Sequence, residues 1–310
     1  EEEALPISIG EIWYNGYRHI QSVVKVSANG EHFVHDNICK AVQLAESKKI
    51  SARQGCTLST LIARKGIPWN VPLSGATIKG LYSFSFGKAT IHILSPNSDD
   101  ISNVESFWKK KLIIDGLLSK AHSEEFWDDA FEYSLSKDKP GFHYHERNVS
   151  KSYDLIKMME EIYEPDDSAT NGSSIAFVLE VDEKRVLFLG DAHAETIVDS
   201  LMELYGKENA PFWFDAVKLS HHGSYNNNSP ELLKLIRCNN WLISTNGDKY
   251  NHPDFPTLAH IIANGNNHEP RLYFNYNIEL SRELTAQSYH DDFEFEIITP
   301  VGEQGITITI

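Results

Sequence analysis

The chain has 310 residues, of which 41% are hydrophobic and 23% are charged, the composition of a globular protein that can bury a sizeable core. Its 44 acidic residues outnumber its 28 basic ones and give a net charge of −16. This charge excludes a generally basic nucleic-acid-binding surface and leaves only a local basic groove or a metal for such contacts. No run of 18 apolar residues is present, so we expect no transmembrane helix and no membrane partner.

The three cysteines, Cys39, Cys56 and Cys238, lie far apart and form no CxxC pair. Their spacing excludes a disulfide framework and a cysteine-based zinc knuckle, and it favours a reducing compartment, which we predict to be the cytoplasm. The first residues are Glu-Glu-Glu rather than a basic and then an apolar stretch, so we expect no signal peptide.

Short apolar runs dominate the first 95 residues. Their pattern predicts strands over 7–14, 81–86 and 90–94, and a helix over 37–47. This part of the chain therefore mixes strands with helix and shows no internal repeat.

Residues 97–170 are rich in charge and poor in β-branched runs. Helical spacing of apolar residues begins at Val104 and returns in SKSYDLIKMMEEIY. We interpret this region as a helical insertion in a single domain that spans residues 1–310. Its last part, EPDDSATNGSS, predicts a mobile acidic link.

From residue 173 onward, strands alternate with helices. Two strands around a turn at 182–184 are predicted by SSIAFVLEVDEKRVLFLGD, and AETIVDSLMELYG predicts a helix that ends at Gly206. Two further strand and helix pairs follow: FDAVKLS with SPELLKLIR, in which Ser229 is the expected N-cap, and NWLISTNG with PTLAHIIANG. The final runs, RLYFNYN, FEFEIITP and GITITI, predict antiparallel, sandwich-like strands. The order indicates an α/β fold with an α+β end.

Three successive strand ends in this half carry carboxylate or imidazole side chains. VLFLGDAH ends at Asp191, AVKLSHHGS ends at His221 and His222, and WLISTNGDKYNHP runs into His252. Each interval holds one helix and one strand, so we expect the three loops to lie side by side beyond the carboxyl ends of the strands, where α/β sheets build their sites.

A carboxylate that converges with two or more imidazoles is a ligand set for zinc, manganese or iron. Such an ion can bind a phosphate or carbonyl oxygen and make water a nucleophile near neutral pH. Taken singly, Asp191 would be an ordinary turn residue and His252 a hydrogen-bonded structural histidine; together with the His-His pair they favour a metal site. After this pair, Gly223, Ser224 and a run of asparagines predict a flexible polar loop.

Three further residues are candidates for contacts with a substrate. His193 follows Asp191 by two positions, Ser224 follows the histidine pair, and Arg53 precedes a glycine turn and a helix in SARQGCTLSTL. Each has a structural alternative: a hydrogen-bonded histidine, a turn residue and a capped surface turn.

Several of these segments belong together: NGSSIAFVLEVDEKRVLFLGDAH, AVKLSHHGS and NHP. Together they resemble the C-terminal half of metallo-β-lactamase-fold hydrolases. The similarity is greatest to the subgroup that includes the hydrolase domain of competence-type DNA-uptake proteins and the choline-phosphate esterases of cell-wall teichoic acid. GEIWYNG, ISARQG and IHILSPN also resemble stand-alone members found with bacterial antiphage systems. The resemblance covers most of the chain and is weakest over 97–170.

This resemblance implies a four-layer αββα sandwich with two divalent metal ions, Zn²⁺ or alternatively Mn²⁺. Asp191 matches the metal-bridging aspartate of the family, and His252 matches a later histidine that binds one metal. His221 and His222 match the paired histidines and are assigned to catalysis, with His222 also assigned to the metal. Which of the two faces the metal stays open.

The family's His-x-His/Asp-x-Asp-His box, which supplies about half of the metal ligands, is not found in this sequence. In the family it precedes a segment like LPISIGEIWYNG, with which this chain starts. We therefore expect the first strands and the box to lie upstream of Glu1, as an N-terminal fragment or a separate polypeptide that completes the site. The alternative is a variant that has lost them.

Two functions follow from these observations. The first is a metal-dependent hydrolase of phosphodiester or phosphoester bonds, in its most specific form a nuclease of antiphage defence that acts on nucleic acid or a nucleotide. The second is a catalytically incomplete scaffold that serves as a protein-interaction module, with a basic partner expected from the net charge. A lactam, thioester or acyl substrate ranks lower, because SHHGS resembles the phosphoesterase subgroup.

Overall fold

The computed structural model describes residues 7–20, 58–114, 155–248, 251–265, 269–285, 287–290, 292–302 and 305–310. They form a mixed α/β structure. The chain divides into two compact units, the first made of Glu1–Ile78 and Ile101–Gly141 and the second of Lys79–Asp100 and Phe142–Ile310. The helix expected over 37–47 and most of the expected helical insertion lie outside the described residues, and the single domain stays a prediction.

The first unit is helical where it is described. It contains α1 (Tyr17–Ile20), α3 (Leu58–Lys65), the 3-10 turn η2 (Val71–Leu73) and the part of α4 (Ser98–Ile114) that begins at residue 101. The strand expected over 7–14 is absent from it, apart from a single bridge between Ile12 and Trp69. The reason is the buried Asn70, whose amide accepts from the Tyr14 N–H at 2.9 Å and donates to the Tyr14 carbonyl at 3.2 Å. A side chain thus takes the place of a neighbouring strand.

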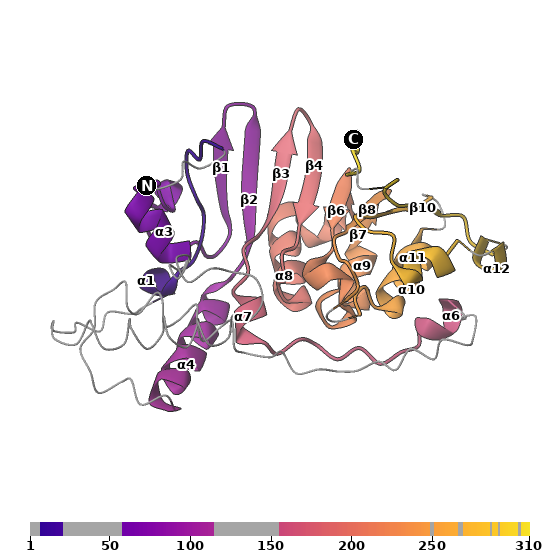
Figure 1. Ribbon diagram of the computed structural model, residues 1–310, viewed down its shortest axis with the longest axis horizontal. Coiled ribbons are helices and arrows are strands. Elements are labelled where there is room, and N and C mark those ends of the chain that lie inside the picture. The colour runs from indigo at the N-terminus through magenta and orange to yellow at the C-terminus, as the bar shows by residue number, and fades with distance from the viewer. Residues whose placement is uncertain are drawn as a thin grey trace. The chain divides into compact units, whose positions relative to one another are not determined.

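The second unit is built on a mixed eight-stranded sheet (Figure 1). In spatial order its strands are β1 (Tyr82–Phe86), β2 (Ala89–Ser95), β3 (Ala176–Val181), β4 (Lys184–Phe188), β6 (Ala216–Lys218), β8 (Asn240–Ile243), β9 (Arg271–Phe274) and β10 (Glu296–Ile298). Strands β1 to β4 are antiparallel, and β4, β6, β8, β9 and β10 are mutually parallel. Two short strands, β5 (Phe212–Phe214) and β7 (Ile236–Cys238), form a separate parallel pair.

The predicted turn between β3 and β4 is confirmed. Asp182 and Glu183 both have positive φ, 47° and 67°, which is the conformation of a two-residue hairpin turn whose twist matches the flanking strands. The turn sets the β3–β4 register, in which Val178 lies opposite Leu187.

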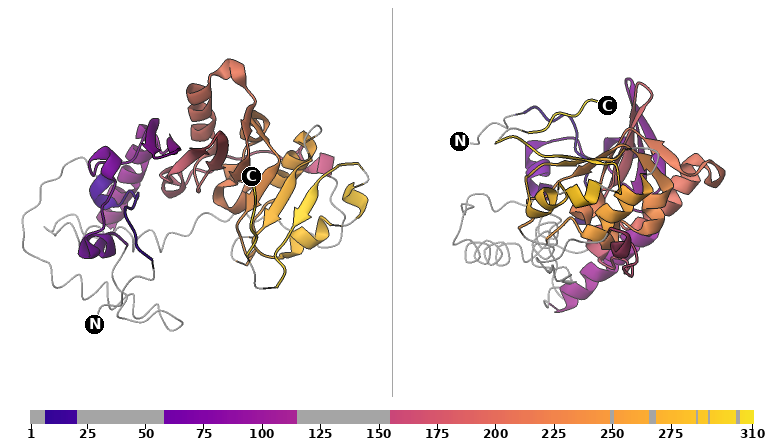
Figure 2. Two further views of the ribbon diagram at one scale, coloured as in Figure 1. Left: turned by 90° about the horizontal axis from the view of Figure 1, so that it is seen from above. Right: turned by 90° about the vertical axis from the view of Figure 1, so that its right-hand side faces the viewer.

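Three helices connect the parallel strands: α8 (Ala194–Tyr205), α9 (Pro230–Leu235) and α10 (Phe255–Asn264). The chain crosses the sheet in one direction from β4 to β9, and right-handed crossovers then place all three helices on the same face (Figure 2). Both predicted helix boundaries are found: α8 ends at Gly206, with φ 81°, and the Ser229 side chain caps α9 by accepting from the Leu232 N–H. The remaining short elements are α6 (Leu155–Met158), α7 (Ala169–Gly172), η3 (Lys207–Asn209), η4 (Ser220–Gly223), η5 (Tyr225–Asn227), α11 (Glu279–Glu283) and α12 (Gln287–His290).

The core lies between these helices and the sheet. One row of aligned side chains crosses five strands and is almost completely buried: Val178, Leu187, Val217, Trp241 and Leu272. Each such side chain contributes about 1.5–3 kcal/mol by leaving water. The row fixes the ends of β4, β6 and β8 relative to one another.

The expected antiparallel tail is wrong. Strand β10 pairs parallel with β9, because the segment that contains α11 and α12 returns the chain to the starting end of the sheet. Residues 305–310 form no strand. The expected acidic link at 164–174 also proves structured: it contains α7, whose N-cap Ser168 accepts from the Asn171 N–H.

No helix in the described part of the chain has the length and apolar character needed to cross a bilayer.

Candidate functional site

The loops that follow β4, β6 and β8 form one edge of the sheet, which we call the site rim. These strands are adjacent and parallel, so their carboxyl ends meet, as the sequence predicts. Asp191 follows β4, His221 and His222 follow β6, and His252 follows β8.

Backbone hydrogen bonds join these loops to one another. The His221 N–H donates to the Gly190 carbonyl at 2.9 Å, and the Asp254 N–H donates to the Gly223 carbonyl at 3.1 Å. The first bond connects the loops after β4 and β6, and the second connects the loops after β6 and β8. The rim is therefore a bonded unit rather than three independent loops.

The histidine pair lies in an unusual turn. His221, His222 and Gly223 have φ values of 41°, 57° and 93°, so three successive residues adopt the left-handed region. This conformation costs a residue other than glycine on the order of 1–2 kcal/mol. A Cβ atom at residue 223 would lie 2.6 Å from Pro253 Cβ, so glycine is also required for the close approach of the two loops. Backbone strain of this kind is concentrated at functional sites.

Buried polar side chains hold the turn in place. The Ser220 hydroxyl donates to the Ala192 carbonyl at 2.9 Å, and the Asn228 amide donates to the carbonyls of Ser220 and Ser224 at 2.9 and 2.6 Å. Asn227 and Asn228 have no exposed surface. The flexible polar loop expected after the histidine pair is therefore wrong, because the asparagines form the hydrogen-bonded support of the turn.

All three rim histidines are anchored through Nδ1. His221 Nδ1 contacts Asn227 Oδ1 at 2.9 Å, His252 Nδ1 contacts Asp254 Oδ1 at 3.0 Å, and His222 Nδ1 contacts the Ser244 carbonyl oxygen. Each partner atom is an oxygen acceptor, so the ring donates through Nδ1 and a neutral ring carries its lone pair on Nε2. Histidines that ligate metals through Nε2 show this pattern.

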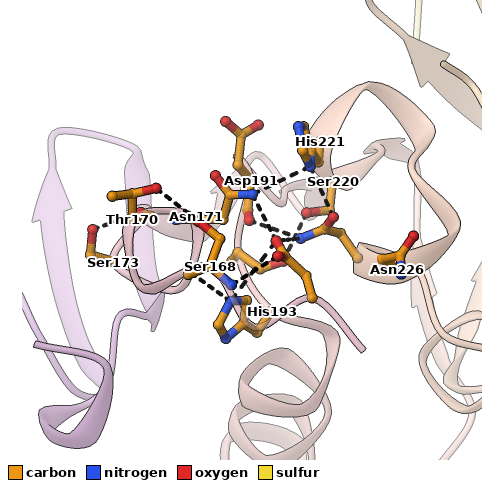
Figure 3. Close-up of polar contacts among 12 residues, drawn as sticks. Ser168, Thr170, Asn171, Ser173, Asp191, His193, Ser220, His221 and Asn226 are labelled. Atoms are coloured by element: carbon orange, nitrogen blue, oxygen red, sulfur yellow. Dashed lines mark hydrogen bonds and ion pairs between the residues drawn. The ribbon is translucent and has the colours of Figure 1, made fainter. Parts of the chain in front are cut away.

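His221 lies close to two other members of the predicted set. Its ring centroid is 5.1 Å from that of His252. Burial lowers the pKa of His221, although the nearby Asp191 carboxylate favours the charged ring. The imidazole is therefore neutral near pH 7, the form that binds metals. Figure 3 shows His221 and Asp191 on the same side of the polar network.

The donor chemistry at the rim fits a divalent transition metal. A carboxylate and imidazoles are ligands of Zn²⁺ and Mn²⁺. Two imidazoles on one tetrahedral zinc have ring centroids about 5 Å apart, given Zn–N bonds of about 2.0 Å. Yet among the described residues no three His, Cys, Asp or Glu side chains come together in a group that could hold an ion. The rim thus contains a fitting pair of imidazoles with a carboxylate nearby, but no closed ligand set.

The other predicted site residues have different surroundings. His193 precedes α8, and its Nε2 contacts the Ser168 carbonyl oxygen at 2.9 Å, on the far side of the network from His221 in Figure 3. Its ring packs against Gly172, where a Cβ atom would lie 2.7 Å away. Ser224 is 3% exposed. Arg53 lies outside the described residues, and the substrate contacts of all three stay predictions.

A cation beside Asp191 was not predicted. Lys218, the last residue of β6, donates from Nζ to the Leu219 carbonyl at 2.7 Å. Burial lowers the pKa of this lysine, and the negative charge of Asp191 opposes the effect. The signal in the sequence was a single lysine in the apolar run FDAVKLS.

Three polar residues next to the rim were also missed. Asp166 and Asn171 lie in the segment expected to be a mobile link, and Asn227 lies in the asparagine run. Asp166 accepts from the amides of Asn171 and Asn227 at 2.7 and 2.8 Å. These residues lie in the polar segments DDSATNGSS and YNNNS, but such segments are also typical of surface loops.

Comparison of the chain with protein-family models, with curated proteins and with solved structures found no match.

Proposed function

We propose that the chain is a metal-dependent hydrolase of phosphoester or phosphodiester bonds. The observation that carries this proposal is the Nδ1 anchoring of His221, His222 and His252 at the ends of adjacent parallel strands. Anchoring through Nδ1 is the pattern shown by histidines that ligate metals through Nε2. The resemblance of SHHGS to the phosphoesterase subgroup favours a phosphate ester over an acyl substrate.

His221 and His252 would hold a divalent ion, with Asp191 and His222 nearby, and further ligands would have to complete the set. When bound, such an ion supplies Lewis-acid chemistry, in which it polarises a phosphoryl oxygen and lowers the pKa of water. The chain itself contributes the neutral imidazole of His221, whose Nε2 can bind a cation or accept a proton. Lys218 adds positive charge close to Asp191.

We further propose that the fold is the four-layer αββα sandwich of the metallo-β-lactamase-fold hydrolases. The sheet face opposite α8, α9 and α10 carries partly buried apolar side chains, interrupted by Lys218, which follows from alternation along the strands. Parallel sheets are normally covered on both faces, and a second sheet would cover this one. The apolar residues of this partly buried face are Phe177, Leu179, Val186, Phe188, Leu242 and Tyr273.

The proposal is tested by metal content and by hydrolysis of bis(p-nitrophenyl) phosphate and of nucleotides, after loading with Zn²⁺ or Mn²⁺. Both measurements are made on this chain and on the product of its complete open reading frame. Asp191→Ala is expected to lower kcat/KM by about 100-fold or more, as loss of a group that stabilises the transition state does. Asp199→Ala, an exposed position on α8, is the control and is expected to have no effect. Absence of bound metal, together with full activity of Asp191→Ala, would contradict the proposal.

A protein-interaction module is the second candidate, and the apolar side chains of this partly buried face favour it. An incomplete hydrolase scaffold would use this face to bind a partner, as exposed apolar patches often do. Phe188→Ser would then abolish partner binding while the rim variants leave it unchanged. In a hydrolase the opposite holds, because Asp191→Ala removes activity.

A further inference from the structure

Asp166 lies behind His221 in a network of hydrogen bonds that includes two buried or half-buried asparagine side chains. We infer that Asp166, acting through Asn227, is a positioning residue that fixes the tautomer of His221, with the proton on Nδ1 and the lone pair on Nε2. The hydrogen bonds alone carry this inference. Its consequence for catalysis rests on the proposed function.

The first step concerns the carboxylate of Asp166. Its Oδ1 accepts from the Ser168 N–H at 2.9 Å, and its Oδ2 accepts from the amides of Asn171 and Asn227 at 2.7 and 2.8 Å. A carboxylate oxygen accepts hydrogen bonds and donates none. The atom of Asn227 that faces Asp166 must therefore be the amide nitrogen.

The second step concerns the other bonds of Asn227. The same amide nitrogen donates to the backbone carbonyl of Asp191 at 3.2 Å, which again is only an acceptor. Both amide hydrogens are thus used, and the amide oxygen faces His221. Because this oxygen lies 2.9 Å from His221 Nδ1, the ring must donate through Nδ1.

One contact would favour the opposite tautomer of His221. The Asn171 amide nitrogen lies 3.4 Å from His221 Nδ1 and would need that atom as an acceptor. The contact is 0.5 Å longer than the one from Asn227, and the Asn171 amide already donates to Asp166 at 2.7 Å. The shorter bond to Asn227 therefore decides the tautomer.

The Nδ1–H tautomer is the form that His221 needs at the rim. Its lone pair on Nε2 can bind a cation or accept a proton, whereas the other tautomer would place a hydrogen on that atom. Groups that orient a metal ligand in this way change metal affinity by about 10 to 100-fold when they are removed. Asp166 would act on the site without touching metal or substrate.

The test uses Asp166→Ala, which removes both acceptor oxygens. The amides of Asn171 and Asn227 then lose their shared acceptor and can turn to offer N–H to His221 Nδ1. The matched control is Asp167→Ala, which changes the exposed neighbour. The readout is the ¹⁵N chemical shift of the two His221 ring nitrogens in the metal-free protein, near pH 8.

Wild type and Asp167→Ala are expected to show Nδ1–H, and Asp166→Ala is expected to gain Nε2–H. A wild-type spectrum with Nε2–H would overturn the inference even if the variant does not fold, and so would an unchanged spectrum of folded Asp166→Ala. The spectra require neither metal nor activity. If they agree with expectation while hydrolysis is absent, the positioning role stands and the proposed function fails.

Discussion

A single carboxylate connects His252 to the turn that follows the histidine pair. Asp254 Oδ1 contacts His252 Nδ1 at 3.0 Å, and its Oδ2 accepts from the Tyr225 N–H at 2.7 Å. Both partners are donors, so both oxygens of the carboxylate are needed. Asp254 thus accepts from His252 Nδ1 as Asn227 accepts from His221 Nδ1. Its second oxygen also holds the two loops together.

Asp254→Asn keeps the size of the side chain but leaves only one acceptor for two donors. We expect zinc affinity to fall by about 10 to 100-fold, because the ring of His252 loses its fixed orientation. We also expect the free energy of unfolding to fall by about 1–3 kcal/mol, since one half-buried donor loses its partner. Zinc titration and urea unfolding measure the two effects. Asp248→Asn, at an exposed position of the same loop, is the control. Wild-type values for both quantities would rule out this role of Asp254.

Among the elements, the turn Ser220–Gly223 is the most constrained part of the rim. Two residues in it have glycine-like φ values although they are histidines, and its one glycine is in contact with Pro253 of the neighbouring loop. The turn can adopt this shape only while both loops keep their places. Site geometry and local stability are therefore coupled in this element.

Comparison of Gly223→Ala with Gly87→Ala separates the cost of backbone strain from the cost of overpacking. Both glycines have positive φ, 93° and 60°, but only at residue 223 would the new Cβ atom meet another residue. We expect Gly87→Ala to cost about 1 kcal/mol from backbone strain. Gly223→Ala should cost about 2–4 kcal/mol, because overpacking is added, and it should also weaken zinc binding. Urea unfolding and zinc titration check this, and equal effects of the two variants would contradict it.

The sequence predicts elements better than it predicts their contacts. The parallel order of β4, β6 and β8 and the cap at Ser229 follow from local signals, namely periodicity, strand spacing and a serine before a helix. Asp166 could not be found in this way, because its bond to Asn227 spans 61 positions. The direction of β10 was also missed, since a pattern of alternating residues does not encode which way a strand runs.

For the whole molecule, each of the two units contains a buried histidine that is held neutral. His19 is 9% exposed in the first unit and His260 is 4% exposed in the second. Burial, with a smaller effect of Arg18, lowers the pKa of His19 from 6.5 to about 4, and burial also lowers the pKa of His260. The Tyr225 hydroxyl donates to the Glu161 carbonyl at 3.2 Å and can only accept from His260 Nε2, which places the hydrogen of the neutral ring on Nε2.

Both histidines should make the protein less stable in acid. The unfolded chain binds a proton at each ring below pH 6.5, whereas the folded chain does not until its lower pKa is reached, so the unfolded state holds more protons in this window. Stability is therefore retained above about pH 6.5 and is lost as the pH falls toward the folded pKa. For His19 the loss between pH 7 and pH 5 is about 2 kcal/mol.

Urea unfolding at pH 7 and pH 5 measures this loss in wild type, His19→Gln and His260→Gln, with a chelator present so that rim ligands do not bind metal. Each substitution removes one titrating ring from one unit only. We expect each variant to be less stable than wild type at pH 7, because packing is lost, but to depend less on pH. A variant whose stability falls between pH 7 and pH 5 by as much as that of wild type would show that its histidine takes up a proton in the folded protein as readily as in the unfolded chain. The acid sensitivity would then come from other groups.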